Sequence, residues 1–148
     1  MKLILACDPK GGIGYQNKLP WDKIQGDLPR FKQLTEGQVI VMGRNTWDSL
    51  PKKPLPNRLN IVITNNPLNY PEDVIATNDL NRLKDYDVWL IGGAKLIESC
   101  WDKITEIHLT KTFAIYTCDT YIDMLKLEEF RLVKEELFPS HAYQIYKR

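Results

Sequence analysis

Apolar residues along the chain cluster into short, nearly continuous runs that are separated by polar segments. Four such runs are rich in Val, Ile and Leu, and they occupy Leu3–Cys7, Val39–Met42, Leu59–Thr64 and Val88–Ile91. Runs of this kind are typical of strands that are covered on both faces, as in a parallel sheet. The pattern therefore predicts strands in the interior of one sheet.

Between these runs, apolar positions repeat at helical spacing. In Asp27–Thr35, three apolar residues fall on one face, a proline lies in the first turn, and Gly37 follows as a stop. Pro9 and the paired glycines before Ile13 predict a flexible loop from Asp8 to about Ile24. Shorter helices are expected from Thr46 to near Leu50, from a cap at Asn78 or Asp79 through Leu83, and from Gly93 to about Trp101.

The last third of the chain has a different pattern. Ile107–Lys111 alternates like a strand, and Phe130–Leu137 with Ala142–Tyr146 predicts an antiparallel hairpin. A further short strand is predicted near Val74–Ile75. Early strands that alternate with helices, followed by strands without them, predict an α/β fold with a mostly parallel sheet and an antiparallel edge. We expect residues 1–148 to form a single domain.

Composition narrows the classes of partner. The 148 residues include 20 Lys and Arg against 19 Asp and Glu, a net charge of +1, so no global field is available to hold nucleic acid or an anionic membrane. The three cysteines and two histidines show no metal-ligand spacing, and no metal is expected. Free thiols favour a reducing compartment, which predicts a cytoplasmic protein.

The ends of the buried runs carry the candidate chemistry. Asp8–Gly14, Gly43–Thr46, Thr64-Asn65 and Gly92-Gly93 all follow predicted strands, and parallel strands end at one edge of a sheet. Gly43–Thr46 places backbone donors, a cation and a hydroxyl at a strand-to-helix turn, which is an arrangement that phosphates favour. Each glycine turn is a weak signal by itself, but the two together favour a dinucleotide.

Two charged side chains each have two interpretations. Asp27 is either the cap of its helix or a carboxylate in an apolar pocket that binds a polar ligand edge. Asp22 is an alternative acid without apolar neighbours on one face. Arg58 is either a solvated loop residue or a bidentate partner for a carboxylate. The residue pattern leaves these interpretations open.

Several motifs follow one another at defined spacings. They are Gly12–Trp21 with Asp27, Phe31 and Thr35 downstream, then Val41–Leu50, Pro54–Ile61, Ile91–Ala94, Leu109-Thr110 and Asp119-Thr120. In this order they resemble the dihydrofolate reductase family, in its short single-domain form, over nearly the whole chain. The resemblance implies an eight-stranded sheet with helices on both faces, and a cis peptide bond at Gly92-Gly93.

The resemblance also implies an activity: NADPH as hydride donor, 7,8-dihydrofolate as acceptor at its pterin C6, and protonation at N5, in a monomer. It implies catalytic roles for Leu19, Trp21, Asp27 and Thr110. It implies substrate contacts from Ile4, Ala6, Asp27, Leu28, Phe31, Leu50, Leu55, Arg58, Ile91 and Thr110. It implies cofactor contacts from Ala6, Ile13, Gly14, Asn17, Gly43, Arg44, Asn45, Thr46, Thr64, Asn65, Gly92, Gly93, Ala94, Lys95 and Leu96.

The chain departs from the family pattern in three places. Ile97 stands where an aromatic residue is common, Cys118 stands where a glycine often precedes the aspartate, and one extra residue lies between Trp21 and Asp27. None of these removes a group that the reaction needs. Two alternatives are a related pterin or pyrimidine reductase on the same fold, and a catalytically silent module that binds folate or a nucleotide.

Overall fold

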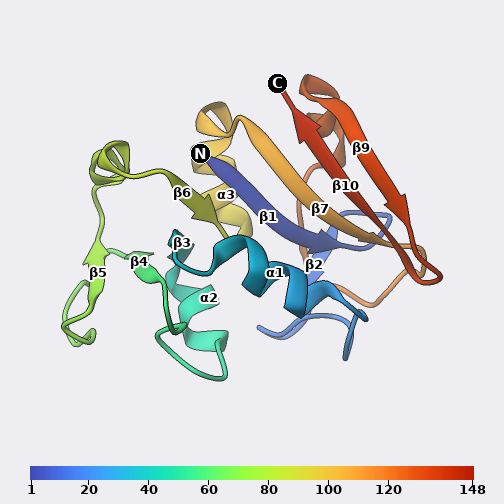
Figure 1. Cartoon of the computed structure of the whole chain (residues 1–148). Coiled ribbons are helices and arrows are strands. Elements are labelled where there is room, and N and C mark those ends of the chain that lie inside the picture. The colour runs from blue at the N-terminus through green and yellow to red at the C-terminus, as the bar shows by residue number, and fades with distance from the viewer.

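Eight strands form one sheet in the computed structural model, which describes residues 1–148 (Figure 1). The strands are β1 Lys2–Cys7, β3 Val39–Gly43, β4 Leu59–Ile63, β5 Val74–Thr77, β6 Val88–Leu90, β7 Glu106–Thr112, β9 Arg131–Leu137 and β10 His141–Lys147. Their spatial order is β5-β4-β3-β6-β1-β7-β10-β9. Neighbours from β5 to β7 are parallel, whereas β10 is antiparallel to β7 and β9, so the predicted architecture is confirmed.

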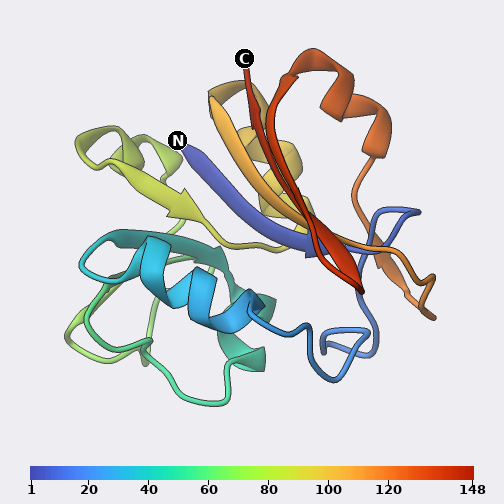
Figure 2. The same cartoon turned by 45° about the vertical axis from the view of Figure 1, so that its right-hand side comes forward.

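Helices cover both faces of this sheet (Figures 1 and 2). They are α1 Asp27–Thr35, α2 Arg44–Ser49 and α3 Ala94–Cys100. Because neighbouring strand residues point to opposite faces, Val41 packs in the core cluster that includes α3, while Ile40 and Met42 pack with Trp47 of α2. Leu34 of α1 packs against that second cluster. The sheet is therefore buried on both sides, as its continuous apolar runs predict.

Three further segments are 3-10 helices: η1 Leu80–Asp85, η2 Trp101–Lys103 and η3 Met124–Glu129. The predicted cap at Asp79 is confirmed, since its side chain accepts a hydrogen bond from the amide of Asn81 at 2.9 Å. The tighter helix type differs from the α-helix that the cap suggests, and η3 is not indicated by the sequence pattern.

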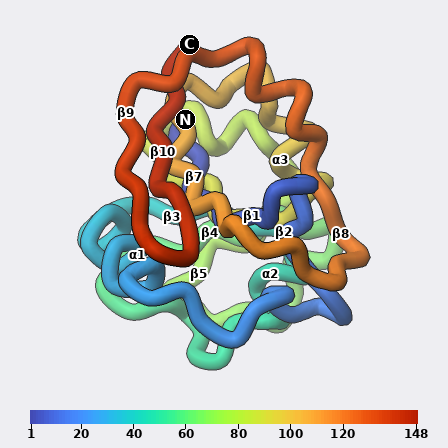
Figure 3. Tube along the Cα trace, turned by 90° about the vertical axis from the view of Figure 1, so that its right-hand side faces the viewer, coloured from blue at the N-terminus to red at the C-terminus, as the bar shows by residue number.

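The prediction that the whole segment from Asp8 to Ile24 is a flexible loop is wrong in part. Residues Gly12–Gly14 form a short strand, β2, which pairs antiparallel with β8, Thr120–Tyr121 (Figure 3). The pairing satisfies backbone groups that a loop leaves to water. Because the partner strand lies about a hundred residues later, no local pattern indicates it.

No helix in the protein is both long enough and apolar enough to span a lipid bilayer. All three cysteines are free thiols, as expected. Cys7 lies in the core beneath the sheet edge, and burial raises the pKa of its thiol to about 12.

A chain of buried polar groups runs along one face of β7 and β10. The His108 ring lies within hydrogen-bond distance of the Tyr143 hydroxyl through Nδ1 and of the Glu106 carboxylate, at 2.6 Å, through Nε2. Burial lowers the pKa of His108, and the carboxylate of Glu106 opposes this only in part. Since a carboxylate can only accept, Nε2 donates to Glu106, and in the tautomer with its single proton on Nε2 the Tyr143 hydroxyl donates to Nδ1. These bonds fix the Tyr143 ring in place.

A second buried histidine makes folding sensitive to pH. His141 stacks on Phe138 at 4.7 Å, and burial, together with the charge of Arg30, lowers the pKa of its imidazole. Because the pKa is lowered, protonating His141 is less favourable in the folded state than in the unfolded state. The folded state is therefore favoured above the ordinary pKa of 6.5, and this stability is lost as pH falls below that value. We expect His141→Phe, which keeps the stacking, to lose less unfolding free energy between pH 7 and pH 5 than the wild type. Urea denaturation at both pH values tests this, and equal losses would contradict it.

Candidate active site

The carboxyl edge of the parallel strands is the centre of the candidate site. β1, β3, β4 and β6 all end there, so the loops predicted to converge do so. The ends of β3 and β6 are joined directly, because the amide of Gly43 donates to the carbonyl of Gly92 at 2.9 Å. The α1 and α2 helices border this edge on one face of the sheet, and α3 begins beside it on the other.

Asp27 is the first residue of α1, and its carboxylate points away from its own helix terminus. The preceding Gly26 has a φ of 86°, and no side chain caps the helix. Instead, the hydroxyl of Thr110, in the centre of β7, donates to Asp27 Oδ1 at 2.7 Å. Thr110 is buried and pairs in register with Ala6 of β1. The helix-cap interpretation of Asp27 is therefore excluded, and the carboxylate is held over the sheet.

The apolar residues predicted to contact substrate come from several elements. Phe31 lies one helical turn after Asp27 and is partly buried, whereas Leu28 is 66% exposed. The other apolar residues predicted to contact substrate pack against the core cluster that contains Trp47; they are Ile4, Leu50, Leu55 and Ile91. These four residues thus share one cluster, on the face of the sheet that α1 and α2 border.

Arg58 is oriented by the chain itself. Its Nε donates to the carbonyl of Pro56 at 2.9 Å, and Nη1 donates to the hydroxyl of Thr35 at 3.0 Å, at the end of α1. The buried amide side chain of Asn60 fixes the preceding turn through bonds to the backbone of Leu55 and Arg58. A guanidinium held on two sides presents its remaining N–H groups outward, which suits a carboxylate.

Glycines bring two helix starts together. The Gly92-Gly93 peptide bond is cis, as the resemblance implies. A Cβ at Gly92 would lie 3.2 Å from the hydroxyl of Thr46, so only a bare backbone permits this approach. Gly43 and Gly93 precede α2 and α3, and no side chain caps either helix. The first amides of both helices thus have no partner within the chain, and this donor set fits the phosphates of a dinucleotide.

Two pockets lie next to this glycine cradle. One, of about 380 Å³, lies between the turn at Gln16–Lys18 and α2, and predicted cofactor residues Asn17 and Asn45 line it. The second, of about 230 Å³, is lined by Arg44 together with Trp47, Asn66, Leu68 and Tyr70 among others. Arg44 lies at the rim, where it pairs with Asp48 at 3.6 Å. Thr64 is buried beside the second pocket and accepts from the amide of Asn66, while Asn65 is exposed.

The loop that carries Leu19 and Trp21 is anchored at both ends. Gln16 and Asn17 form a tight turn with φ values of 50° and 61°. The Asp119 carboxylate accepts from the amide of Gln16, and its own amide donates to the carbonyl of Gly14, both at 2.9 Å. Trp21 is buried edge-on against Tyr116, and Leu19 is 58% exposed. The loop therefore lies against the segment before β8.

A buried carboxylate at the end of β1 connects the same two segments. Asp8 Oδ1 accepts from the amides of Lys10 and Gly12, at 2.9 and 2.8 Å, and Oδ2 accepts from the amide of Tyr116 at 3.1 Å. The sequence pattern places Asp8 only in a strand-end loop. Nothing local signals its role, since the third donor lies 108 residues later.

Ile13 and Gly14 are in β2, and Ala94, Lys95 and Leu96 form the first turn of α3. No group of three or more His, Cys, Asp or Glu side chains is arranged to hold a metal ion.

Comparison with known proteins agrees with this geometry. A parallel sheet covered on both faces, with paired glycine turns at its carboxyl edge, defines an α/β nucleotide-binding protein. A sequence model of the dihydrofolate reductase family matches residues 1–147, and the chain belongs to that family.

Named relatives extend the comparison. The chain is 36% identical to dihydrofolate reductase type 8 of Escherichia coli, over 98% of this chain and 94% of the relative. It is 38% identical to a bifunctional dihydrofolate reductase-thymidylate synthase of Paramecium tetraurelia over 89% of this chain, and it spans only 30% of that relative. Among solved structures, dihydrofolate reductase from Enterococcus faecalis, complexed with NADP(H) and RAB-propyl, superimposes with a TM-score of 0.87 at 27% identity. That superposition covers 99% of this chain and 95% of the other.

The contact between Gly12 and Cys118 predicts a compensating pair of substitutions. A Cβ at Gly12 would collide with Cys118 Sγ and would lie 2.9 Å from the Cys118 Cβ. We expect Gly12→Ala to destabilise the protein by about 1–3 kcal/mol, as for other overpacked sites. Cys118→Gly in the same chain should recover most of that loss, and Cys118→Ala, which keeps the Cβ at 2.9 Å, should recover less. Denaturation of the double-mutant cycle measures the coupling; additive effects would show that the two side chains do not meet.

Proposed function

We propose that this protein reduces 7,8-dihydrofolate to 5,6,7,8-tetrahydrofolate with NADPH. The observation that carries the proposal is the Asp27 carboxylate, held by Thr110 beside a glycine cradle at the carboxyl edge of the sheet. The resemblance assigns every residue that the reaction requires to this one chain. We therefore also propose that residues 1–148 act as a single domain, as a monomer in the cytoplasm.

The pterin ring would bind across Asp27. Its 2-amino group and N3–H are donors, and an ionised carboxylate accepts both in a bidentate contact. Thr110 occupies Oδ1 from the sheet side, which fixes the carboxylate plane. Phe31, Leu50 and Leu55 then enclose the ring and the aminobenzoyl group, and burying these apolar surfaces adds affinity without charge.

The cofactor would lie across the two helix starts. The amides after Gly43 and Gly93, with the Thr46 hydroxyl, would hold the pyrophosphate, and Arg44 with Thr64 and Asn65 would hold the 2′-phosphate. Ala6, Ile13 and Gly14 would border the nicotinamide, and Asn17 and Asn45 the ribose beside it. When bound, NADPH supplies the hydride that the pterin C6 accepts.

Protonation at N5 is the step that the chain must assist. Addition of a hydride at C6 leaves N5 to take a proton, and the negative charge of Asp27 favours the protonated pterin electrostatically. The loop of residues 9–24, which Asp119 and Asp8 hold through its backbone amides, would lie over this region and exclude water from it. Trp21 and Leu19 would form the inner and outer parts of that cover.

The alternatives are less well supported. A reductase for a smaller pterin or pyrimidine has no use for Arg58, whose guanidinium is oriented next to the apolar wall. A silent folate-binding module would use the same carboxylate to hold the pterin, so turnover is what distinguishes it from an enzyme. The direct test is turnover: purified protein with NADPH and dihydrofolate should consume both in equal amounts, and NADH should be a poor donor. Binding of both ligands without turnover would favour the silent module.

Asp27→Asn should separate charge from shape. The amide keeps much of the hydrogen bonding but loses the negative charge, so we expect kcat/KM at pH 7 to fall by about 10²-fold or more. Activity should rise as pH falls, because a pterin that is already protonated needs no assistance. Asp22→Asn, at an exposed carboxylate of the neighbouring loop, is the matched control. A variant with near wild-type activity at pH 7, or with a flat pH profile, would contradict the assignment.

Arg58→Leu should act on binding and leave the chemical step intact. Loss of a charge-assisted pair with the glutamate α-carboxylate costs about 1.5–3 kcal/mol, so the Kd for dihydrofolate should rise about 10- to 100-fold. A dihydropterin without the glutamate should bind both proteins within about threefold. Because Arg58 also bonds Thr35 and Pro56, equal losses for both compounds would instead indicate a structural role.

A further inference from the structure

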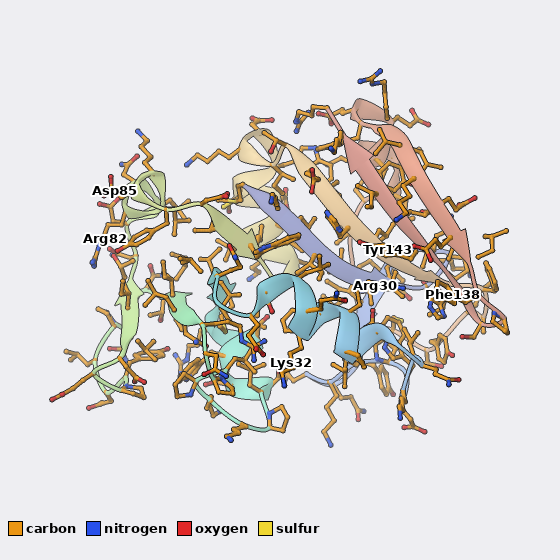
Figure 4. The ribbon with its side chains drawn as sticks, viewed as in Figure 1. Arg30, Lys32, Arg82, Asp85, Phe138 and Tyr143 are labelled. Carbon is orange, nitrogen blue, oxygen red and sulfur yellow. The ribbon has the colours of Figure 1, made fainter.

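A partly buried cation of α1, Arg30, takes no part in the reaction described above. Arg30 follows Asp27 by three residues in α1, so the two side chains share one face of the helix. Figure 4 shows Arg30 next to Tyr143 and Phe138, between α1 and the end of β10. Its guanidinium carbon lies 3.8 Å from the centre of the Tyr143 ring and 5.3 Å from that of Phe138.

The charge of Arg30 has no local counter-ion. Its Nη1 is buried without a hydrogen-bond partner, and Arg30 is in none of the ion pairs of the protein. A guanidinium stays protonated at any pH at which the protein is folded. The aromatic faces attract the cation, but they carry no net charge. A positive charge is therefore held in place in a poorly solvated position.

The platform beneath Arg30 is rigid. The Tyr143 hydroxyl bonds His108, and His108 bonds Glu106, so two side chains hold the ring on which the guanidinium stacks. The stacking in turn fixes the position of the Arg30 charge, which is on the same helix as Asp27.

We propose that Arg30 is a positioning residue whose fixed charge keeps Asp27 ionised while the bound pterin excludes water. The inference rests on the proposed function. A pterin that covers the carboxylate removes the water that stabilises its charge, and the same step lowers the local dielectric and strengthens the attraction of Arg30. The cation thus acts most strongly when the substrate is in place.

Other charged and titratable groups face this pair, and the test has to separate them. His141 is the nearest: its pKa is lowered by burial and by Arg30, and Asp27 opposes this. Removing Arg30 would let His141 take up a proton more easily and replace part of the missing charge. The remaining groups on the packed elements are Tyr143 on β10, Glu106 and His108 on β7, and Glu136 on β9.

The experiment measures folate binding without cofactor, so that no turnover occurs, by fluorescence quenching between pH 5 and 9. Folate needs the ionised carboxylate, so its affinity falls at acid pH. In Arg30→Met this fall should begin about one pH unit higher than in the wild type, and the affinities should converge within about threefold at pH 9. The shift should be larger in the His141→Phe background, where no imidazole can compensate.

Three variants serve as controls. Arg30→Lys keeps the charge and should follow the wild type. Lys32→Met removes an exposed cation of the same helix, paired only with Glu36, and should also follow it. In an Asp27→Asn background, Arg30→Met should no longer shift the profile, because the titrating group is gone. If Arg30→Met does not fold, Arg30→Gln replaces it with the same expected shift.

Two outcomes would overturn the inference. One is a loss of folate affinity in Arg30→Met by the same factor at every pH, which would indicate a structural role. The other is an unshifted profile in both the single variant and the His141→Phe background. Failure of the wild type to bind folate at any pH is a separate result, and it would overturn the proposed function itself.

Discussion

The hydrogen bond from Thr110 to Asp27 connects the start of α1 to the centre of the sheet, across 83 residues of sequence. Without it, the carboxylate would be free to satisfy the amides of its own helix, as an acidic residue at this position commonly does. Because Gly26 supplies no side chain to that terminus, the first turn of α1 depends on backbone geometry and the carboxylate is available to the sheet. This contact ties the start of α1 to β7, while Leu34 packs its later part against the cluster that contains Ile40 and Met42.

The rest of the site is built by backbone rather than by side chains. At Gly43 and at Gly92-Gly93 the strands of the sheet end close together: a Cβ at Gly92 would lie 3.2 Å from the hydroxyl of Thr46, and one at Gly43 would contact the amide nitrogen of Gly93 at 3.7 Å. Two helices therefore begin a few ångströms apart with their amides unpaired. A charged ligand that spans both starts meets fixed dipoles, and its orientation does not depend on the choice of side-chain rotamers.

Local patterns predicted most of the framework, and contacts between distant residues supplied what they did not. Buried strands such as Val39–Met42 and the terminal hairpin followed from hydrophobic periodicity, which is a property of neighbouring residues. The two interpretations of Asp27 could not be separated in that way, because the deciding partner lies on β7. The β2–β8 pairing and the amides gathered by Asp8 depend on partners about a hundred residues away. The contact of Arg30 with aromatic rings could not be predicted either, because a cation and the ring that it stacks on follow no fixed spacing in the sequence.

The buried carboxylate of Asp8 constrains how this part of the fold can change between homologues. It receives amides from the first turn of the chain and from Tyr116, and Gly12 leaves the volume that Cys118 fills. The loop of residues 9–24 therefore cannot be exchanged between proteins without the segment that it contacts. A loop transplanted from a relative with a larger residue at position 12 would meet the wrong partner surface. We expect homologues to differ at positions 12 and 118 together, so that the segment before β8 changes whenever the loop changes.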